Sequence, residues 1–140
     1  MDIDTLDNPG WMLKVQLFGT PLADVAFLIT GQIIGRHEPP VAAMECPQRL
    51  LFPSRHIYLL CAGLVNLAMG VHFVLPEPAL RRGAAIAGSL LVLASAVLTF
   101  FAFFAEPMAG RPPGVISSLG LFALFGGVLL YALVSLRRSK

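Results

Sequence analysis

Three long apolar runs fill the last two-thirds of the chain, and ionisable residues are nearly absent from them. Residues 83–105 and 114–136 each hold 23 residues without Asp, Glu, Lys, Arg or His, and residues 57–75 hold 19 with His72 as the only ionisable side chain. A hydrocarbon core about 30 Å thick is crossed by about 20 residues of α-helix. Because backbone groups in lipid must be paired inside the structure, each run is expected to be helical. The pattern predicts an α-helical integral membrane protein with a three-helix transmembrane bundle over residues 55–136.

Prolines and charged residues mark the expected ends of these helices. Ser54 is expected to cap the first helix, because its hydroxyl can accept a hydrogen bond from a free backbone N–H of the first turn. Pro76 and Pro78 end the first run, and Glu106-Pro107 ends the second. The short loops between the runs predict antiparallel neighbours, and a basic tail, residues 137–140, follows the third.

Residues 1–35 alternate between apolar and polar positions over short stretches, which is typical of β-strands. Residues 12–18 place Leu and Val on one face and Lys and Gln on the other. Asn8-Pro9-Gly10-Trp11 has the chemistry of a type II turn, and Gly31 separates two further apolar stretches. We expect a short β-rich segment, a hairpin or meander of three or four strands. A unit of this size needs a partner, a second copy or the membrane surface to cover its apolar side.

Residues 36–54 form a proline-rich connector. One or two helical turns are expected over residues 41–45, after Pro40. Residues 48–52 combine apolar side chains with Arg49, which fits either a segment lying in the membrane interface or a simple ordered linker.

Composition and charge agree with a membrane location. The chain is 56% hydrophobic and 13% charged, against about 25% charged in soluble domains. Residues 1–48 carry six acidic and two basic residues, a net charge of −4, whereas residues 49–140 carry eight basic and two acidic residues, a net charge of +6. Three spans place five of the basic residues near the membrane on the C-terminal side and three on the other. This imbalance predicts a multi-pass protein of the cell membrane with an external N-terminus and a cytoplasmic C-terminus.

Few side chains in the spans can carry chemistry. His56 and His72 are 16 residues apart on one helix, or about 24 Å, so they cannot ligate one haem iron within a single chain. The three runs contain no carboxylate for a proton relay, and Cys46 and Cys61 match no zinc spacing. No catalytic residue, metal site or cofactor is expected.

Polar and small side chains in the runs instead indicate contacts between helices. Asn66 is the only amide in any run, and such a group usually finds a hydrogen-bond partner on a neighbouring helix. Small residues let helices approach closely, within a compact bundle or a homo-oligomer. The candidate packing residues are Asn66, Gly63, Gly70, Ala84, Gly88, Gly120, Gly126 and Gly127. The candidate interfacial residues, at the ends of the runs, are His56, His72, Arg81, Arg82, Glu106, Arg137 and Arg138.

The stretch Thr5-Leu6-Asp7-Asn8-Pro9-Gly10-Trp11, with the residues around it from 3 to 20, resembles the N-terminal segment of a small soluble family. That family is the fifty-third family of immunity proteins in polymorphic toxin systems. The resemblance implies a β-hairpin at the start of the chain and a role in binding and neutralising a toxin. It stops after Thr20, and that family has no membrane spans.

These patterns favour a small membrane protein that works without catalysis, as an accessory or assembly subunit acting through helix packing. Its partners would be lipid and either a second copy or another membrane protein, with a soluble protein partner at residues 1–35 as a further option and no nucleic acid. The main alternative is a toxin-neutralising immunity protein with a membrane anchor. A haem or quinone redox subunit is disfavoured by the placement of the histidines.

Overall fold

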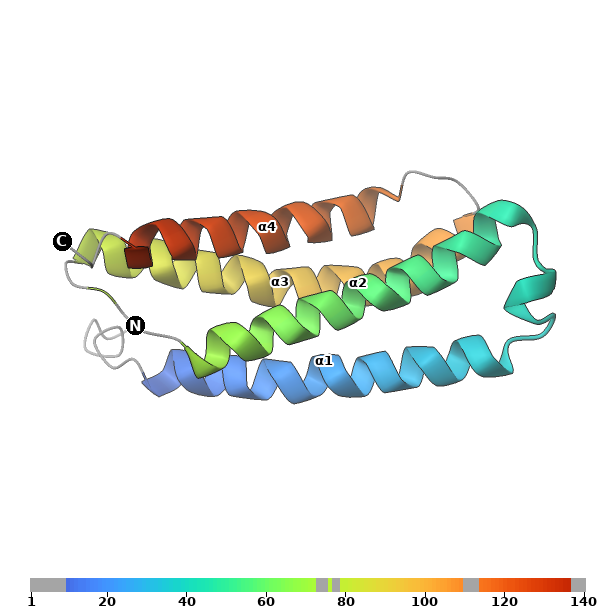
Figure 1. Cartoon of the computed structure of the whole chain (residues 1–140), viewed down its shortest axis with the longest axis horizontal. Coiled ribbons are helices and arrows are strands. Elements are labelled where there is room, and N and C mark those ends of the chain that lie inside the picture. Colours follow the sequence, from blue (N-terminus) through green and yellow to red (C-terminus); the bar gives the residue numbers. More distant parts are fainter. Residues whose placement is uncertain (1–9, 73–75, 77–78, 110–113, 137–140) are drawn as a thin grey trace.

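The computed structural model describes residues 10–72, 76, 79–109 and 114–136. In this part of the chain, four long helices run up and down along one axis, in the chain order α1, α2, α3 and α4 (Figure 1). α1 packs mainly on α2, α2 also packs on α3, and α3 packs on α4. The helices therefore follow one another across the bundle in sequence order, and α1 and α4 lie at opposite edges (Figure 1).

The β-rich segment expected for residues 1–35 is wrong wherever the structure describes it. Residues 10–35 belong to α1, Gly10–Arg36, and no strand occurs in the described part of the chain. Residues 1–9, including the expected turn at Asn8-Pro9, lie outside the described residues. Pro21 stands inside α1, where it removes one backbone hydrogen bond without ending the helix. The alternation of Leu13, Val15 and Leu17 was too short to distinguish a strand from an apolar helix.

The first predicted span begins earlier than expected. α2 covers Cys46–Val71, so most of the predicted connector's second half is helical. Pro47 occupies the first turn, where its missing N–H needs no partner, and Pro53 stands within the helix. Ser54 is therefore no N-cap, and its hydroxyl donates to the carbonyl of Leu51. A short 3₁₀-helix, η2, covers Val41–Ala43, within the segment expected to form a helical turn.

In the part of the chain whose side chains the structure describes, three helices are long and apolar enough to cross a membrane. The candidate spans are Gln48–Val71, Ala79–Pro107 and Val115–Ser135. They lie in α2, in α3 (Ala79–Ala109) and in α4 (Val115–Leu136). The chain thus has the multi-pass membrane character that the apolar runs predict, and each helix includes most of the run assigned to it.

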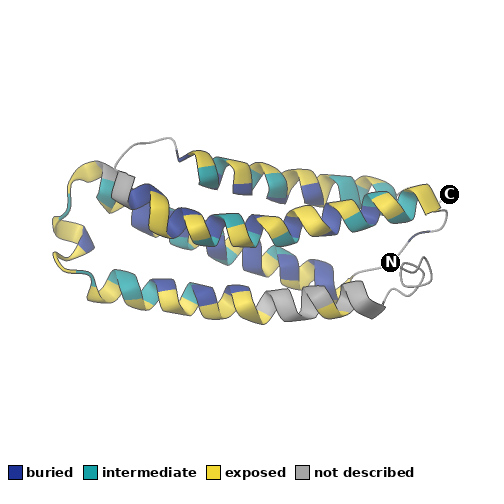
Figure 2. Ribbon diagram, turned by 180° about the vertical axis from the view of Figure 1, so that it is seen from behind, coloured by how far each residue is buried: buried dark blue, intermediate teal, exposed yellow. Residues whose placement is uncertain are grey.

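Glycines of α3 and α4 bring the backbones of these two helices close together. A Cβ atom on Gly88 would lie 2.8 Å from the carbonyl oxygen of Gly127, and one on Gly127 would lie 2.6 Å from that of Gly88. Beside this contact, Val92 packs with Met69 and Leu124. Buried side chains line the inner faces of all four helices, and exposed ones lie outside (Figure 2). The core is thus a narrow seam between helices.

Gly88→Ile should destabilise the bundle, because the added side chain meets the backbone of α4 and cannot be accommodated by a rotamer change. Overpacking of this kind costs about 1–3 kcal/mol. Thermal unfolding of the purified protein in mild detergent measures the loss. Gly83→Ile is the matched control in the same helix, because a Cβ atom there meets nothing within 4 Å. Equal midpoints for the two variants would contradict the assigned α3–α4 contact.

Candidate functional site

A buried ion pair joins three helices at one end of the bundle. The Nε atom of Arg55 in α2 donates to Oε2 of Glu106 near the end of α3, 2.5 Å away. The other carboxylate oxygen, Oε1, accepts from the backbone N–H of Ser117 in the first turn of α4, at 2.8 Å. The two charged side chains are 8% and 7% exposed. The partial positive charge at the start of α4 and the guanidinium group therefore hold the carboxylate from two sides.

Gly114 makes room for this carboxylate. A Cβ atom at Gly114 would overlap the carboxylate of Glu106, so another residue would displace the ion pair. The carbonyl of Gly114 also accepts from the hydroxyls of Ser117 and Ser118. The ion pair has a structural role, because the carboxylate accepts its hydrogen bonds from two other helices of the same chain.

His56 of α2 contacts α1 through a hydrogen bond and through ring stacking. Nδ1 of His56 lies 2.9 Å from the hydroxyl oxygen of Thr30. The same hydroxyl oxygen lies 2.9 Å from the carbonyl oxygen of Phe27, to which it can donate. The ring also stacks on Phe27 at 4.0 Å between centroids. His56, expected at a membrane interface, thus takes part in packing α1 onto α2.

The predicted role of Asn66 in helix contacts has a counterpart in the structure. Its side-chain nitrogen donates to the carbonyls of Ala62 in the same helix and Val92 in α3, at 2.8 and 3.1 Å. The hydroxyls of Ser95 and Thr99 in α3 donate instead to carbonyls of their own helix. The amide oxygen of Asn66 is buried and makes no hydrogen bond.

The predicted small residues divide into inward-facing and outward-facing sets. Gly63 faces α1, where a Cβ atom would lie 3.3 Å from that of Ala23, and Gly120 faces Thr99 and Leu98 of α3. Gly88 and Gly127 face each other, Gly70 is buried and Ala84 is half-buried. Gly126 is exposed, and a Cβ atom there would meet nothing within 4 Å. Most of these positions therefore serve contacts within the chain.

The remaining predicted interfacial residues stand mostly at helix ends. His72 caps α2, and its carbonyl accepts from the hydroxyl of Tyr131 in α4. Arg81 and Arg82 lie half-buried in the first turn of α3, whereas Arg137 and Arg138 fall outside the described residues. Glu106 differs from the expectation because it is buried in the ion pair with Arg55. The sequence contains a signal for this pair. Arg55 precedes the first apolar run and Glu106 follows the second, and these two ends meet when the runs pack as antiparallel helices.

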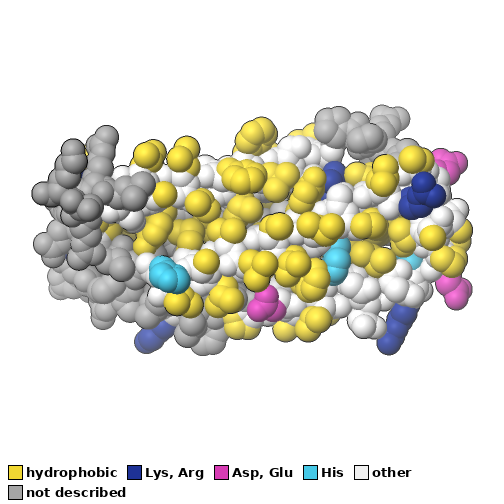
Figure 3. Space-filling view, viewed as in Figure 1, with side chains coloured by type: hydrophobic (Ala, Val, Ile, Leu, Met, Phe, Trp, Pro, Cys, Tyr) yellow, Lys and Arg dark blue, Asp and Glu magenta, His cyan; other side chains and the backbone are white. Residues whose placement is uncertain are grey.

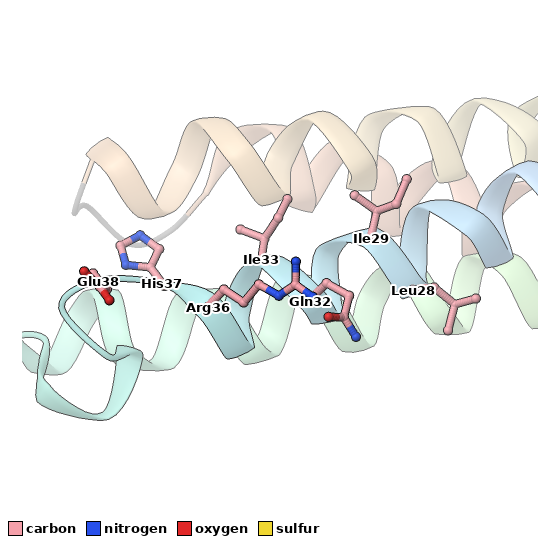
Figure 4. A pocket seen from close by; sticks show the side chains of 7 residues that line it. All are labelled: Leu28, Ile29, Gln32, Ile33, Arg36, His37 and Glu38. Atoms are coloured by element: carbon pink, nitrogen blue, oxygen red, sulfur yellow. The ribbon is translucent and has the colours of Figure 1, made fainter.

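Two hollows mark the surface around α1. An open hollow of about 560 Å³ lies along the C-terminal half of α1, with Leu28, Ile29 and Ile33 at one end and Arg36, His37 and Glu38 at the other (Figure 4). An apolar groove of about 430 Å³ separates α1 from α3, lined by residues that include Leu22, Ala26 and Phe100, with Leu59 of α2. Within the described residues, no three His, Cys, Asp or Glu side chains come together as metal ligands.

Glu106→Gln should destabilise the protein strongly, because the amide still accepts from Ser117 while Arg55 is left as an unpaired buried charge. Breaking a buried pair in this way costs about 3–5 kcal/mol. Arg55→Leu should cost a similar amount by leaving the carboxylate unpaired. The double variant, which contains no unpaired charge, should recover much of the loss. Chemical unfolding in detergent measures all three, and strictly additive losses would contradict the coupling.

Comparison with family models, curated proteins and solved structures gives no match. The resemblance of residues 3–20 to an immunity protein family stays a prediction, and the hairpin that it implied is not formed by residues 10–20, which are helical. The function therefore has to be inferred from the geometry of the bundle and of its outer surface.

Proposed function

We propose that this protein is a non-catalytic accessory or assembly subunit of a membrane complex, acting through the packing of its helices against other membrane helices. The observation that carries the proposal is the difference between the inside and the outside of the bundle. The hydrogen bonds of the buried side chains Asn66, Ser95 and Glu106 go to the same chain, and large apolar side chains cover the outside of the bundle. The apolar outer surface is therefore available to pack against the helices of other membrane proteins.

The interior supports the proposal because its polar groups hold the bundle together. Glu106 joins α2, α3 and α4, Asn66 joins α2 to α3, and His56 joins α1 to α2. Each of these bonds fixes one helix against the next. A subunit that positions other proteins needs such rigidity, because a loose surface would lose entropy whenever a partner bound.

The outer face of α4 supports the proposal by its shape. Large apolar side chains stand out from it on successive turns, among them Phe122, Phe125 and Leu129, which are 76%, 68% and 61% exposed. Gly126 lies between them and, because it has no side chain, leaves a small depression in this surface. Helices in membranes associate by fitting side chains into gaps of this kind, because lipid supplies no hydrophobic force between them.

Gly126→Ile should abolish association through the α4 face while leaving the monomer folded, because the new side chain fills the gap and meets nothing in its own chain. Self-association is measured by energy transfer between donor- and acceptor-labelled protein in lipid vesicles over a range of lipid-to-protein ratios. Association with other membrane proteins is measured by their recovery with the tagged protein in mild detergent.

Ala68→Ile is the matched control, because it adds the same side chain at another exposed position, on α2. This variant should retain the oligomer or the recovered partner. The proposal fails if the wild-type protein is monomeric in vesicles and recovers no membrane protein. The assignment to α4 fails if Gly126→Ile and Ala68→Ile behave alike.

A further inference from the structure

α1 has the length and composition of a membrane-spanning helix. Residues 17–34 form a stretch of 18 in which Asp24 is the only ionisable side chain. The whole helix holds 27 residues, or about 40 Å, enough to cross a hydrocarbon core of about 30 Å. Pro21 and the glycines within it are tolerated in membrane helices, where they are more frequent than in soluble ones.

The packing of α1 places it at the same depth as the candidate spans. Gly31 contacts His56, and Ala23 contacts Gly63, so α1 runs antiparallel to α2 across the middle of that span. Gly63 lies between the ends of the Gln48–Val71 span, about 5 Å from its midpoint. A bilayer that encloses α2 and α3 therefore also encloses the middle of α1.

The outer face of α1 is apolar, as expected for contact with lipid. Leu22 and Leu28 are 69% and 66% exposed there, and Val25 and Ile29 are also exposed. Polar groups gather where the helix ends, with Arg36 followed by His37 and Glu38 (Figure 4). On the face seen in Figure 3, hydrophobic side chains cover most of the middle of the molecule, and an acidic side chain stands among them.

Asp24 is an acidic residue within this exposed part of α1. Its side chain is exposed, beside the point where α1 crosses Gly63, and it makes no hydrogen bond or ion pair with any described residue. Ionisable groups within membranes almost always face a protein interior or a cavity and pair with another group. A carboxylate near the bilayer centre on the outside of one chain therefore belongs to the interior of a larger assembly.

We propose that α1 is a fourth membrane-spanning helix and that Asp24 pairs with a lysine or arginine at mid-membrane in a helix of another membrane protein. This inference rests on the proposed function, whose partner it describes. Charge identifies the partner's chemistry. The nearest cation of the candidate spans along α2, Arg55, is eight residues from Gly63, or about 12 Å. A second copy would present at this depth another Asp24, which has the same sign.

A fourth span also changes the expected topology. The residues before α1 and those after α4 then lie on the same side of the membrane, with the loop containing η2 on the other. Single cysteines at Asp2, Ala43 and Ser139, in a Cys46→Ser, Cys61→Ala background, report the sides by labelling with an impermeant maleimide in intact cells. Positions 2 and 139 should label alike, and position 43 should label oppositely. Labelling of position 2 together with 43, and opposite to 139, would overturn the proposal.

The pairing is tested with a defined probe, a synthetic transmembrane helix of leucine and alanine with one central arginine. Energy transfer between the labelled protein and this helix in phosphatidylcholine vesicles should show association about tenfold tighter than with the same helix lacking arginine. Asp24→Asn should remove the preference, and Asp24→Glu should keep most of it. Thermal unfolding of each variant shows that the bundle is intact.

The outcomes separate this inference from the proposed function. Equal affinity of wild-type and Asp24→Asn protein for the arginine helix would overturn the pairing. Self-association that is lost in Asp24→Asn, without any added helix, would overturn the choice of a cationic partner in favour of a second copy. Gly126→Ile in the same assay should keep the preference for the arginine helix. The test of Asp24 is therefore independent of whether the α4 face binds a partner.

Discussion

Polar groups within a bilayer cannot rely on water, and this constraint determines how the bundle is held together. Each polar side chain deep in the seam must find a partner in a neighbouring turn or a neighbouring helix. Ser95 and Thr99 use carbonyls of α3 itself. Asn66 extends one bond across to α3, and Glu106 uses a guanidinium group and a backbone N–H from two other helices. The bonds that cross between helices fix their order and spacing, while glycines allow the close approach.

The spans could be predicted from the sequence because charge is excluded from a membrane helix over a fixed length. Their ends could not be predicted as well, since a proline that stops one helix can stand in the first turn or the interior of another, as Pro47 and Pro53 do in α2. Small residues were recognised as packing positions, but the pairing of Gly88 with Gly127 requires the register of α3 against α4. That register depends on the whole interface, including the ion pair of Glu106.

α1 could not be recognised from local propensity. Its apolar stretch is rich in Val, Ile, Phe and Thr, residues that favour strands in water. In contact with other helices and lipid, the need to pair each backbone group outweighs that preference and favours a helix. Gly31, which suggested a break between strands, instead lets the ring of His56 approach the backbone of α1. The stretch also contains Asp24, whereas the three runs predicted as spans contain no acidic residue.

The same residue connects the packing of the chain to its partners. Arg55 and Glu106 show how this fold treats a charge near the membrane boundary, by burial and direct pairing. Asp24 lies deeper and has no partner among the described residues. If the rule that governs the rest of the bundle also holds there, the pairing must be completed by a second protein. The charge pair would then fix the depth at which the partner helix packs on α1, because dispersion contacts between apolar surfaces alone do not fix it.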